Sequence, residues 1–325
     1  MTIQEYLLHS NSDAFSSRRK WQLLTGRFTG RLNRPLSKMI WPRSQKHLRH
    51  FDHEYSFTRD KIGSLSAVFF KQTQLIRSIP VHEILPQITR PVTLVTTGPS
   101  ALDYDWESLR RSGRMIVTVT GGTKFLQDRG FNPELLVVTD PDFCKLNGFH
   151  IRDAAGIPLV IEYRSAAAAH RYFPTSLDHR RVSLIERVNK WYGIPELSHE
   201  SLCSMNRESG SPFVIPDNTT DRLGRLGWSN RLALGFYPSS TVAFVALQVL
   251  VELGAKDIEI VGMDLGGTHS VYANALPSKL QQTYSTIILP SFFSMKSALA
   301  GRGIRIKNLS PVSPLPTEIF CLNPN

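Results

Sequence analysis

Cysteine is scarce in this chain of 325 residues, which has only Cys144, Cys203 and Cys321 and no CxxC pair. Such spacing argues against a disulfide framework and a structural zinc site, and it favours a reducing compartment. No run of about 18 uninterrupted apolar residues occurs, so we expect no membrane-spanning helix. The N-terminus lacks a charged start followed by an apolar run, so we expect no secretory signal.

Acidic residues are missing between Ala14 and Phe51, where ten Lys or Arg alternate with Trp, Phe and Leu. This composition is typical of an interfacial anchor, because anionic lipid attracts each nearby cation by about 1 kcal/mol. Glycine and proline interrupt any long amphipathic helix there, so a solvated arm is the alternative. We expect residues 1–88 to form a basic arm, helical or irregular, that contacts an anionic membrane or glycolipid through residues 14–50.

The formal net charge of +11 also implies an anionic partner. Three kinds of partner carry the required negative charge: nucleic acid, a membrane surface, and a phosphorylated or carboxylated substrate. No nucleic-acid recognition module is visible, so we expect no nucleic-acid partner. The sequence also lacks the GxGxxG fingerprint of dinucleotide sites and the GxxxxGK[ST] fingerprint of NTP sites.

Short apolar strands alternate with helical segments after residue 89, which predicts a doubly wound, mostly parallel α/β sheet of a Rossmann-like type. We expect this catalytic domain to span residues 89–325, with a lid insertion at about 165–232. Ligands of such sheets bind beyond the carboxyl ends of the strands. The predicted strands cover 91–97, 115–120, 135–141, 158–162, 257–264 and 304–311, and a buried helix covers 241–253.

Polar turns follow several of these strands. Thr97-Gly98-Pro99-Ser100 is a glycine turn that leads into a helix, and such a turn either receives phosphate or simply reverses the chain. Ser239, Ser240 and Thr241 precede the buried helix, where hydroxyl groups either cap the helix or bind a phosphate or ribose. Asp264 follows another predicted strand, and its carboxylate either stabilises the loop after that strand or has a functional role.

Together, these motifs resemble the bacterial sialyltransferases of glycosyltransferase family 42 and, more closely, the lipopolysaccharide-core Kdo transferases. The matching segments are GFYPSSTVAFVALQVLVELGAKDIEIVGMDLGG, LPSKLQQTYSTIILPSFFSM and IRIKNLSPVSPLP. The resemblance runs from about residue 92 to 315, is strongest after 234, and leaves the N-terminal arm outside. It implies a fold of the GT-A or family-42 type and a CMP-activated sugar donor. The single phosphate of such a donor requires no metal.

The resemblance also implies site residues. CMP would lie against Gly98, Pro99 and Ser100, with Thr120 and Gly121 on the second strand. The cytidine or donor sugar would meet Ser239, Ser240 and Thr241, close to Asp264. Ser310 and Pro311 would reach the nucleotide from the last strand.

The resemblance accounts for only some of the catalytic residues of the sialyltransferases. Sialyltransferases hold the leaving phosphate with two tyrosines; Tyr272 stands at the second position and Gly266 at the first. Their histidine base has no counterpart between residues 279 and 295. His269 and Asp140 are therefore the candidate bases, although a loop histidine is more often solvated and Asp140 would equally orient acceptor hydroxyls.

The resemblance therefore implies an inverting, metal-independent transferase that moves Kdo from CMP-Kdo to the lipopolysaccharide inner core. Its acceptor partner would be the lipid A-core, held at the inner face of the inner membrane by a cytoplasmic, peripheral protein. A transferase of CMP-sialic acid or another nonulosonate is the first alternative. A basic protein that binds nucleic acid or anionic lipid without catalysis is the second.

Overall fold

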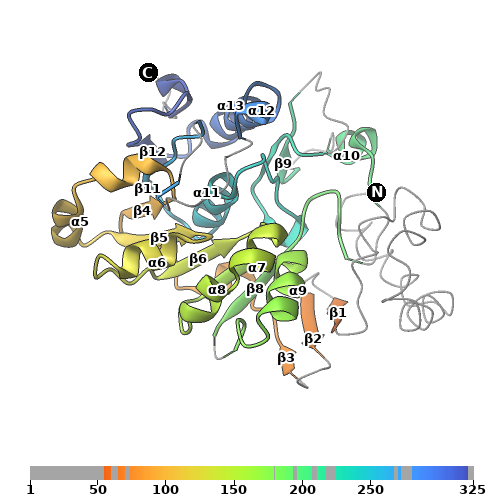
Figure 1. Cartoon of the computed structure of the whole chain (residues 1–325). Coiled ribbons are helices and arrows are strands. Elements are labelled where there is room, and N and C mark those ends of the chain that lie inside the picture. The colour runs from red at the N-terminus through yellow and green to blue at the C-terminus, as the bar shows by residue number, and fades with distance from the viewer. Residues whose placement is uncertain are drawn as a thin grey trace, which may run out of the picture.

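A seven-stranded parallel sheet forms the centre of the computed structural model (Figure 1). The structure describes residues 55–59, 65–69, 74–178, 180–192, 196–206, 211–216, 224–266, 270–271 and 280–320. The strand order is β12-β11-β4-β5-β6-β7-β8, and every neighbouring pair is parallel. The strands are β4 (Val92–Val95), β5 (Met115–Val119), β6 (Leu135–Val138), β7 (Leu159–Glu162), β8 (Val182–Ile185), β11 (Asp257–Val261) and β12 (Arg305–Asn308).

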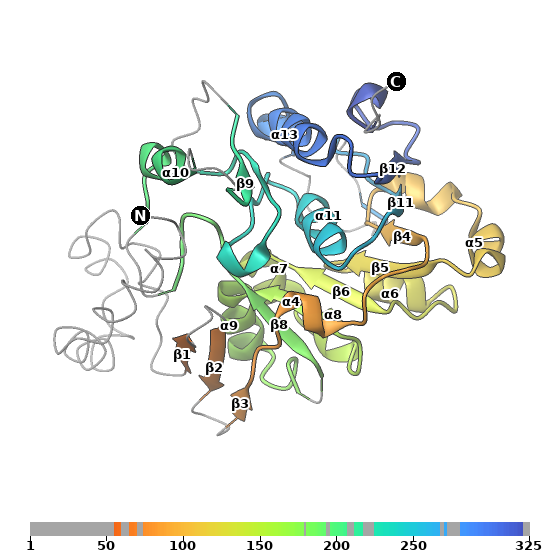
Figure 2. The same ribbon diagram turned by 180° about the vertical axis from the view of Figure 1, so that it is seen from behind.

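Helices cover both faces of this sheet, which confirms the predicted doubly wound α/β class (Figures 1 and 2). Strands β4 to β8 are buried along their whole length, because apolar side chains alternate between two helical layers. Leu94 and Val117 pack into the cluster around α11, whereas Leu136 and Ile161 pack into the cluster around α7 and α9.

One helical layer contains α4 (Val81–Ile84), α11 (Val242–Glu252) and α13 (Leu289–Leu299). Helix α11 is apolar on all sides because it lies between the sheet and α13, where Phe244 meets Phe292 edge to face at 5.0 Å. The opposite layer contains α6 (Gly122–Gln127), α7 (Pro141–Asn147), α8 (Phe149–Asp153) and α9 (Tyr163–Tyr172).

The shorter elements lie around these layers. They are η2 (Pro99–Asp103), α5 (Trp106–Ser112), α10 (His199–Asn206), β9 (Phe213–Val214), β10 (Trp228–Ser229), η3 (Leu232–Leu234), α12 (Leu280–Thr283), the π-helical turn η4 (Tyr284–Ile288) and η5 (Thr317–Phe320). No helix within the described ranges has the length and apolar character needed to cross a bilayer.

The N-terminal region differs from the expected helical or irregular arm. Strands β1 (Tyr55–Arg59), β2 (Leu65–Phe69) and β3 (Gln74–Ile76) form an antiparallel sheet. Leu65 and Ile76 are buried in the cluster under β7 and β8, which explains why this segment folds with the sheet. Residues 14–50, which carry the proposed membrane contact, lie outside the described residues.

The expected insertion at about 165–232 also differs from the structure. Helix α9 and strand β8 lie inside that range, yet they complete the central sheet and its helical layer. Their sequence periodicity is weak because β8 has only four residues and α9 is rich in alanine. The part of the range that lies outside the sheet begins after β8.

Candidate functional site

The strand order reverses beside β4, because β5 follows on one side of it and β11 lies on the other. Ligands of doubly wound sheets bind at such a switch point, beyond the carboxyl ends of the strands. Asp264 lies there and is only 4% exposed. Its carboxylate accepts from the backbone N–H of Ser100 at 2.9 Å, from the Ser100 hydroxyl, and from the Ser310 hydroxyl at 2.5 Å. One carboxylate therefore joins the ends of β4, β11 and β12.

Gly98 is required at this junction because no side chain fits there. A Cβ at this position would lie 2.1 Å from the Gly262 carbonyl oxygen and 2.6 Å from Asp264 Oδ2. The Gly98 N–H donates to the same Gly262 carbonyl at 2.9 Å. The predicted glycine turn is thus found directly after β4, and close contact with the end of β11 explains its glycine.

The N-terminus of α11 opens toward the same edge of the sheet. Ser239 and Ser240 hold left-handed backbone conformations, with φ of 43° and 57°. Thr241 occupies the N-cap position, and no side chain among the described residues caps the helix. The Ser239 hydroxyl is buried and has no hydrogen-bond partner in the part of the chain that the structure describes. An uncapped helix N-terminus favours an anion, and a buried hydroxyl without a partner marks a place where a ligand would complete the bonding.

Further backbone strain lies at the ends of β5 and β11. Thr120 directly follows β5 with φ of 46°, and Leu265 follows Asp264 with φ of 53°. Each such conformation costs on the order of 1–3 kcal/mol and persists where the surrounding structure enforces it. These two residues and the serine pair are all of the non-glycine residues with positive φ among those described. All four flank strand ends or the α11 N-terminus at the carboxyl edge.

A charged cluster lies farther along the same edge, at the ends of β7 and β8. Glu162 is fully buried, and its Oε1 accepts from Arg164 Nε at 2.7 Å and lies 3.2 Å from Arg187 Nε. The other oxygen, Oε2, is buried, and none of the described residues donates a hydrogen bond to it. Two guanidinium groups thus share one carboxylate oxygen.

The pKa values reflect this burial. Desolvation lowers the pKa of Arg187, the charge of Arg164 adds to that lowering, and the carboxylate of Glu162 opposes it. For Arg164 desolvation acts in the same direction, but the nearby Glu162 outweighs it and raises the pKa. Both arginines are cationic at neutral pH, because a guanidinium keeps its proton in proteins.

The other predicted residues occupy the following places. Asp140 is exposed after β6, where its Oδ1 caps α7 by accepting from the Asp142 N–H at 2.9 Å. Gly121 is buried, Pro99 is partly exposed and Pro311 is exposed. His269 and Tyr272 lie outside the described residues. The hydrogen bonds of the edge bring together Ser100, Asp264 and Ser310, with Gly98 beside them, whereas Asp140 lies two strands away from β4.

Sequence reasoning missed the cluster of Glu162, Arg164 and Arg187. Glu162 ends a predicted strand, so a charged residue at the carboxyl end of a buried strand was the available signal. Arg187 gave no such signal, because β8 was assigned to the insertion.

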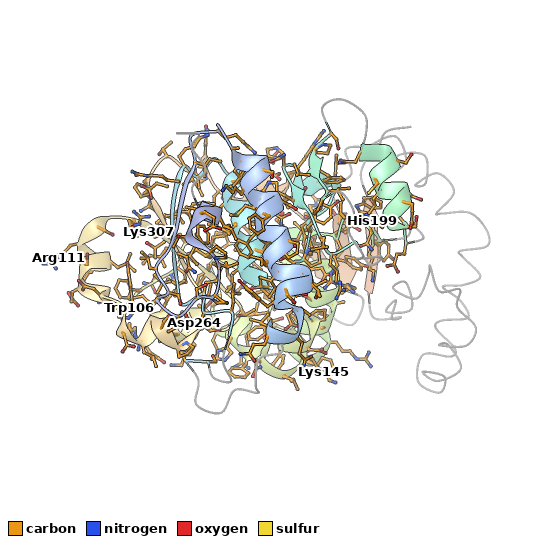
Figure 3. The ribbon with its side chains drawn as sticks, turned by 90° about the horizontal axis from the view of Figure 1, so that it is seen from above. Trp106, Arg111, Lys145, His199, Asp264 and Lys307 are labelled. Atoms are coloured by element: carbon orange, nitrogen blue, oxygen red, sulfur yellow. The ribbon has the colours of Figure 1, made fainter. Side chains whose placement is uncertain are left out.

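Asp264 appears in Figure 3 well away from His199 on α10, so the His199–Cys203 contact of 3.2 Å is separate from this edge.

The described residues bring no group of three or more His, Cys, Asp or Glu into an arrangement that could hold a metal ion. No protein-family model matches the chain, and no curated protein matches it at a significant level.

Proposed function

We propose that the chain is an inverting glycosyltransferase that moves Kdo from CMP-Kdo to a lipopolysaccharide inner-core acceptor. One observation carries the proposal: α11 begins without a side-chain cap among the described residues, at the same edge of the sheet where Asp264 joins three strand ends. Helix α11 lies over β5 and β6. Neighbouring strands are about 4.8 Å apart, so the helix N-terminus and the β4 turn lie within reach of one nucleotide.

The chemistry of a CMP-activated ulosonic acid fits this arrangement. The bond between the anomeric carbon and the phosphate oxygen breaks, and its electron pair stays on the phosphate of CMP. The N–H groups at the start of α11 stabilise that added negative charge. An acceptor hydroxyl attacks the anomeric carbon from the opposite side and gives its proton to a base, for which Asp140 and His269 are our candidates.

The Ser239–Ser240 backbone supports this proposal because its strain is otherwise unexplained. Two consecutive left-handed serines direct the chain into α11 and leave its first N–H groups without a side-chain cap. Glycine would relieve the strain, whereas serine adds hydroxyl donors for a phosphate or a sugar.

Release of CMP from two donors tests the proposal. We expect the protein to release CMP from CMP-Kdo in the presence of a core acceptor, with the same rate after addition of EDTA. Turnover of CMP-sialic acid instead would move the assignment to a sialyltransferase on the same scaffold. Absence of turnover with both donors would refute the transferase and leave a binding role for the basic segments.

A further inference from the structure

The cluster of Glu162, Arg164 and Arg187 has more hydrogen-bond donors than its own acceptors use. Arg187 Nε lies 3.2 Å from Glu162 Oε1 but has no hydrogen-bond partner among the described residues, and no hydrogen bond joins its two terminal nitrogens to those residues. Its side chain is 24% exposed and that of Arg164 is 15% exposed. The buried Glu162 therefore lies against two guanidinium groups on partly exposed side chains.

The nearby acids leave these donors available. Glu196 is paired with Lys190 at 3.2 Å, and Asp140 accepts a backbone N–H as the cap of α7. Glu162 is thus the only carboxylate in ion-pair contact with Arg187 among the described residues, and it shares a single oxygen with both arginines. A planar guanidinium with two free terminal nitrogens matches a carboxylate or a phosphate.

The cluster adjoins the donor site through the backbone. Phe236 runs parallel to Arg187: the Phe236 N–H donates to the Glu186 carbonyl at 2.8 Å, and the Val188 N–H donates to the Phe236 carbonyl at 3.1 Å. Ser239 follows Phe236 by three residues, which span at most about 10 Å of extended chain. A molecule bound at Arg187 would therefore lie next to the sugar of a donor held at α11.

We propose that Arg187 and Arg164, positioned by Glu162, bind the anionic group of the acceptor sugar, so that the acceptor is a sugar acid or a sugar phosphate rather than a neutral sugar. This inference rests on the proposed transferase function. The buried Oε2 of Glu162, which has no hydrogen-bond partner among the described residues, would accept from a hydroxyl of that sugar and not from its anionic group.

Steady-state kinetics of Arg187→Met and the matched control Arg171→Met test the inference. Arg171 lies on α9 and is exposed. We expect Arg187→Met to raise the KM for an anionic acceptor about 30-fold, with the KM for CMP-Kdo unchanged, because a charged bidentate contact is lost. Arg171→Met should change neither value. Arg187→Lys, which keeps the charge but loses the planar fork, should fall between wild type and Arg187→Met.

Four acceptors identify the anion: Kdo-terminated lipid A, its carboxyl methyl ester, a heptose phosphate-terminated core and its dephosphorylated form. If wild type prefers the free carboxylate to its methyl ester and Arg187→Met does not, the bound group is a sugar acid. If wild type prefers the phosphate-terminated core to its dephosphorylated form and Arg187→Met does not, the bound group is a sugar phosphate. Equal KM values for all four acceptors in wild type and variant would overturn the inference.

Acceptor binding without donor separates this inference from the proposed function. Calorimetry of the Kdo-terminated and phosphate-bearing acceptors reports on Arg187 even if CMP-Kdo is never turned over. Weaker binding by Arg187→Met than by Arg171→Met, with unchanged thermal melting, would support the anion site. Equal binding by both variants would refute the anion site. If Arg187→Met has a lowered melting temperature, acceptor binding by Arg187→Lys is compared with that of Arg171→Met instead.

Discussion

Removal of the Asp264 carboxylate is the sharpest perturbation of the switch point, because this one side chain joins three strand ends. In Asp264→Ala the Ser100 N–H and two serine hydroxyls lose their acceptor. The two serine hydroxyls can turn toward water that enters the space left by the shortened side chain, but the Ser100 N–H has a fixed direction. Asp264→Asn keeps the shape and one oxygen for that N–H, and its amide can donate to the serine oxygens.

The size of the effect follows from these contacts. A hydrogen bond to a charged group contributes about 1.5–3 kcal/mol, and part of that is offset by the cost of burying the carboxylate. We therefore expect Asp264→Ala to lower the free energy of unfolding by about 3 kcal/mol and Asp264→Asn to lower it by about 1 kcal/mol. Asp153→Asn, an exposed surface ion pair, should change it by less than about 0.5 kcal/mol.

Urea unfolding followed by circular dichroism measures these differences. The midpoint should fall in the order Asp153→Asn, Asp264→Asn, Asp264→Ala, while the slope with denaturant stays constant. CMP affinity should fall in the same order, because the β4 turn is held by the same bonds. An Asp264→Ala protein as stable as the Asp153→Asn control would refute the claim that Asp264 joins the strands.

Three further predictions concern other residues. Gly98→Ala should lower the free energy of unfolding by about 2–3 kcal/mol in chemical denaturation, since its Cβ would overlap the Gly262 carbonyl. Ser240→Gly should raise stability by about 1 kcal/mol by relieving its positive φ, yet weaken CMP binding in calorimetry through loss of the hydroxyl. Burial pushes the pKa of Asp257 up, but Arg114 and Arg305 outweigh that effect and hold the pKa below 3.8. The stability that the Asp257 carboxylate contributes should therefore be complete above about pH 4 and lost at lower pH. Asp257→Asn should destabilise the protein at pH 7 and not near pH 2.

The sheet and the donor turn could be predicted from the sequence because their signals are local. Each buried strand is a short β-branched run, and Gly98 follows one of them directly. The backbone conformations of Ser239 and Ser240 carry no comparable local signal. Serine is common at helix starts in ordinary conformations, so nothing in the residue type of these two positions predicts a positive φ.

The long-range contacts of the site could not be predicted. Ser100 and Asp264 are 164 residues apart, and only the strand order places their strands side by side. Arg187 was missed because four residues of β8 are too few to distinguish a sheet strand from a loop in a weakly periodic region. The N-terminal strands were missed because the basic composition of the preceding segment dominated the interpretation of the whole arm.

A crystal structure of the protein with CMP bound tests the proposed donor site most directly. We expect a phosphate within about 3 Å of the N–H groups in the first turn of α11, which lack a side-chain cap among the described residues. We also expect the nucleoside to lie along the turn from Gly98 to Ser100, with the Asp264 bonds intact. A CMP molecule bound away from the carboxyl edge of the sheet, or with its phosphate remote from α11, would refute the proposed donor site.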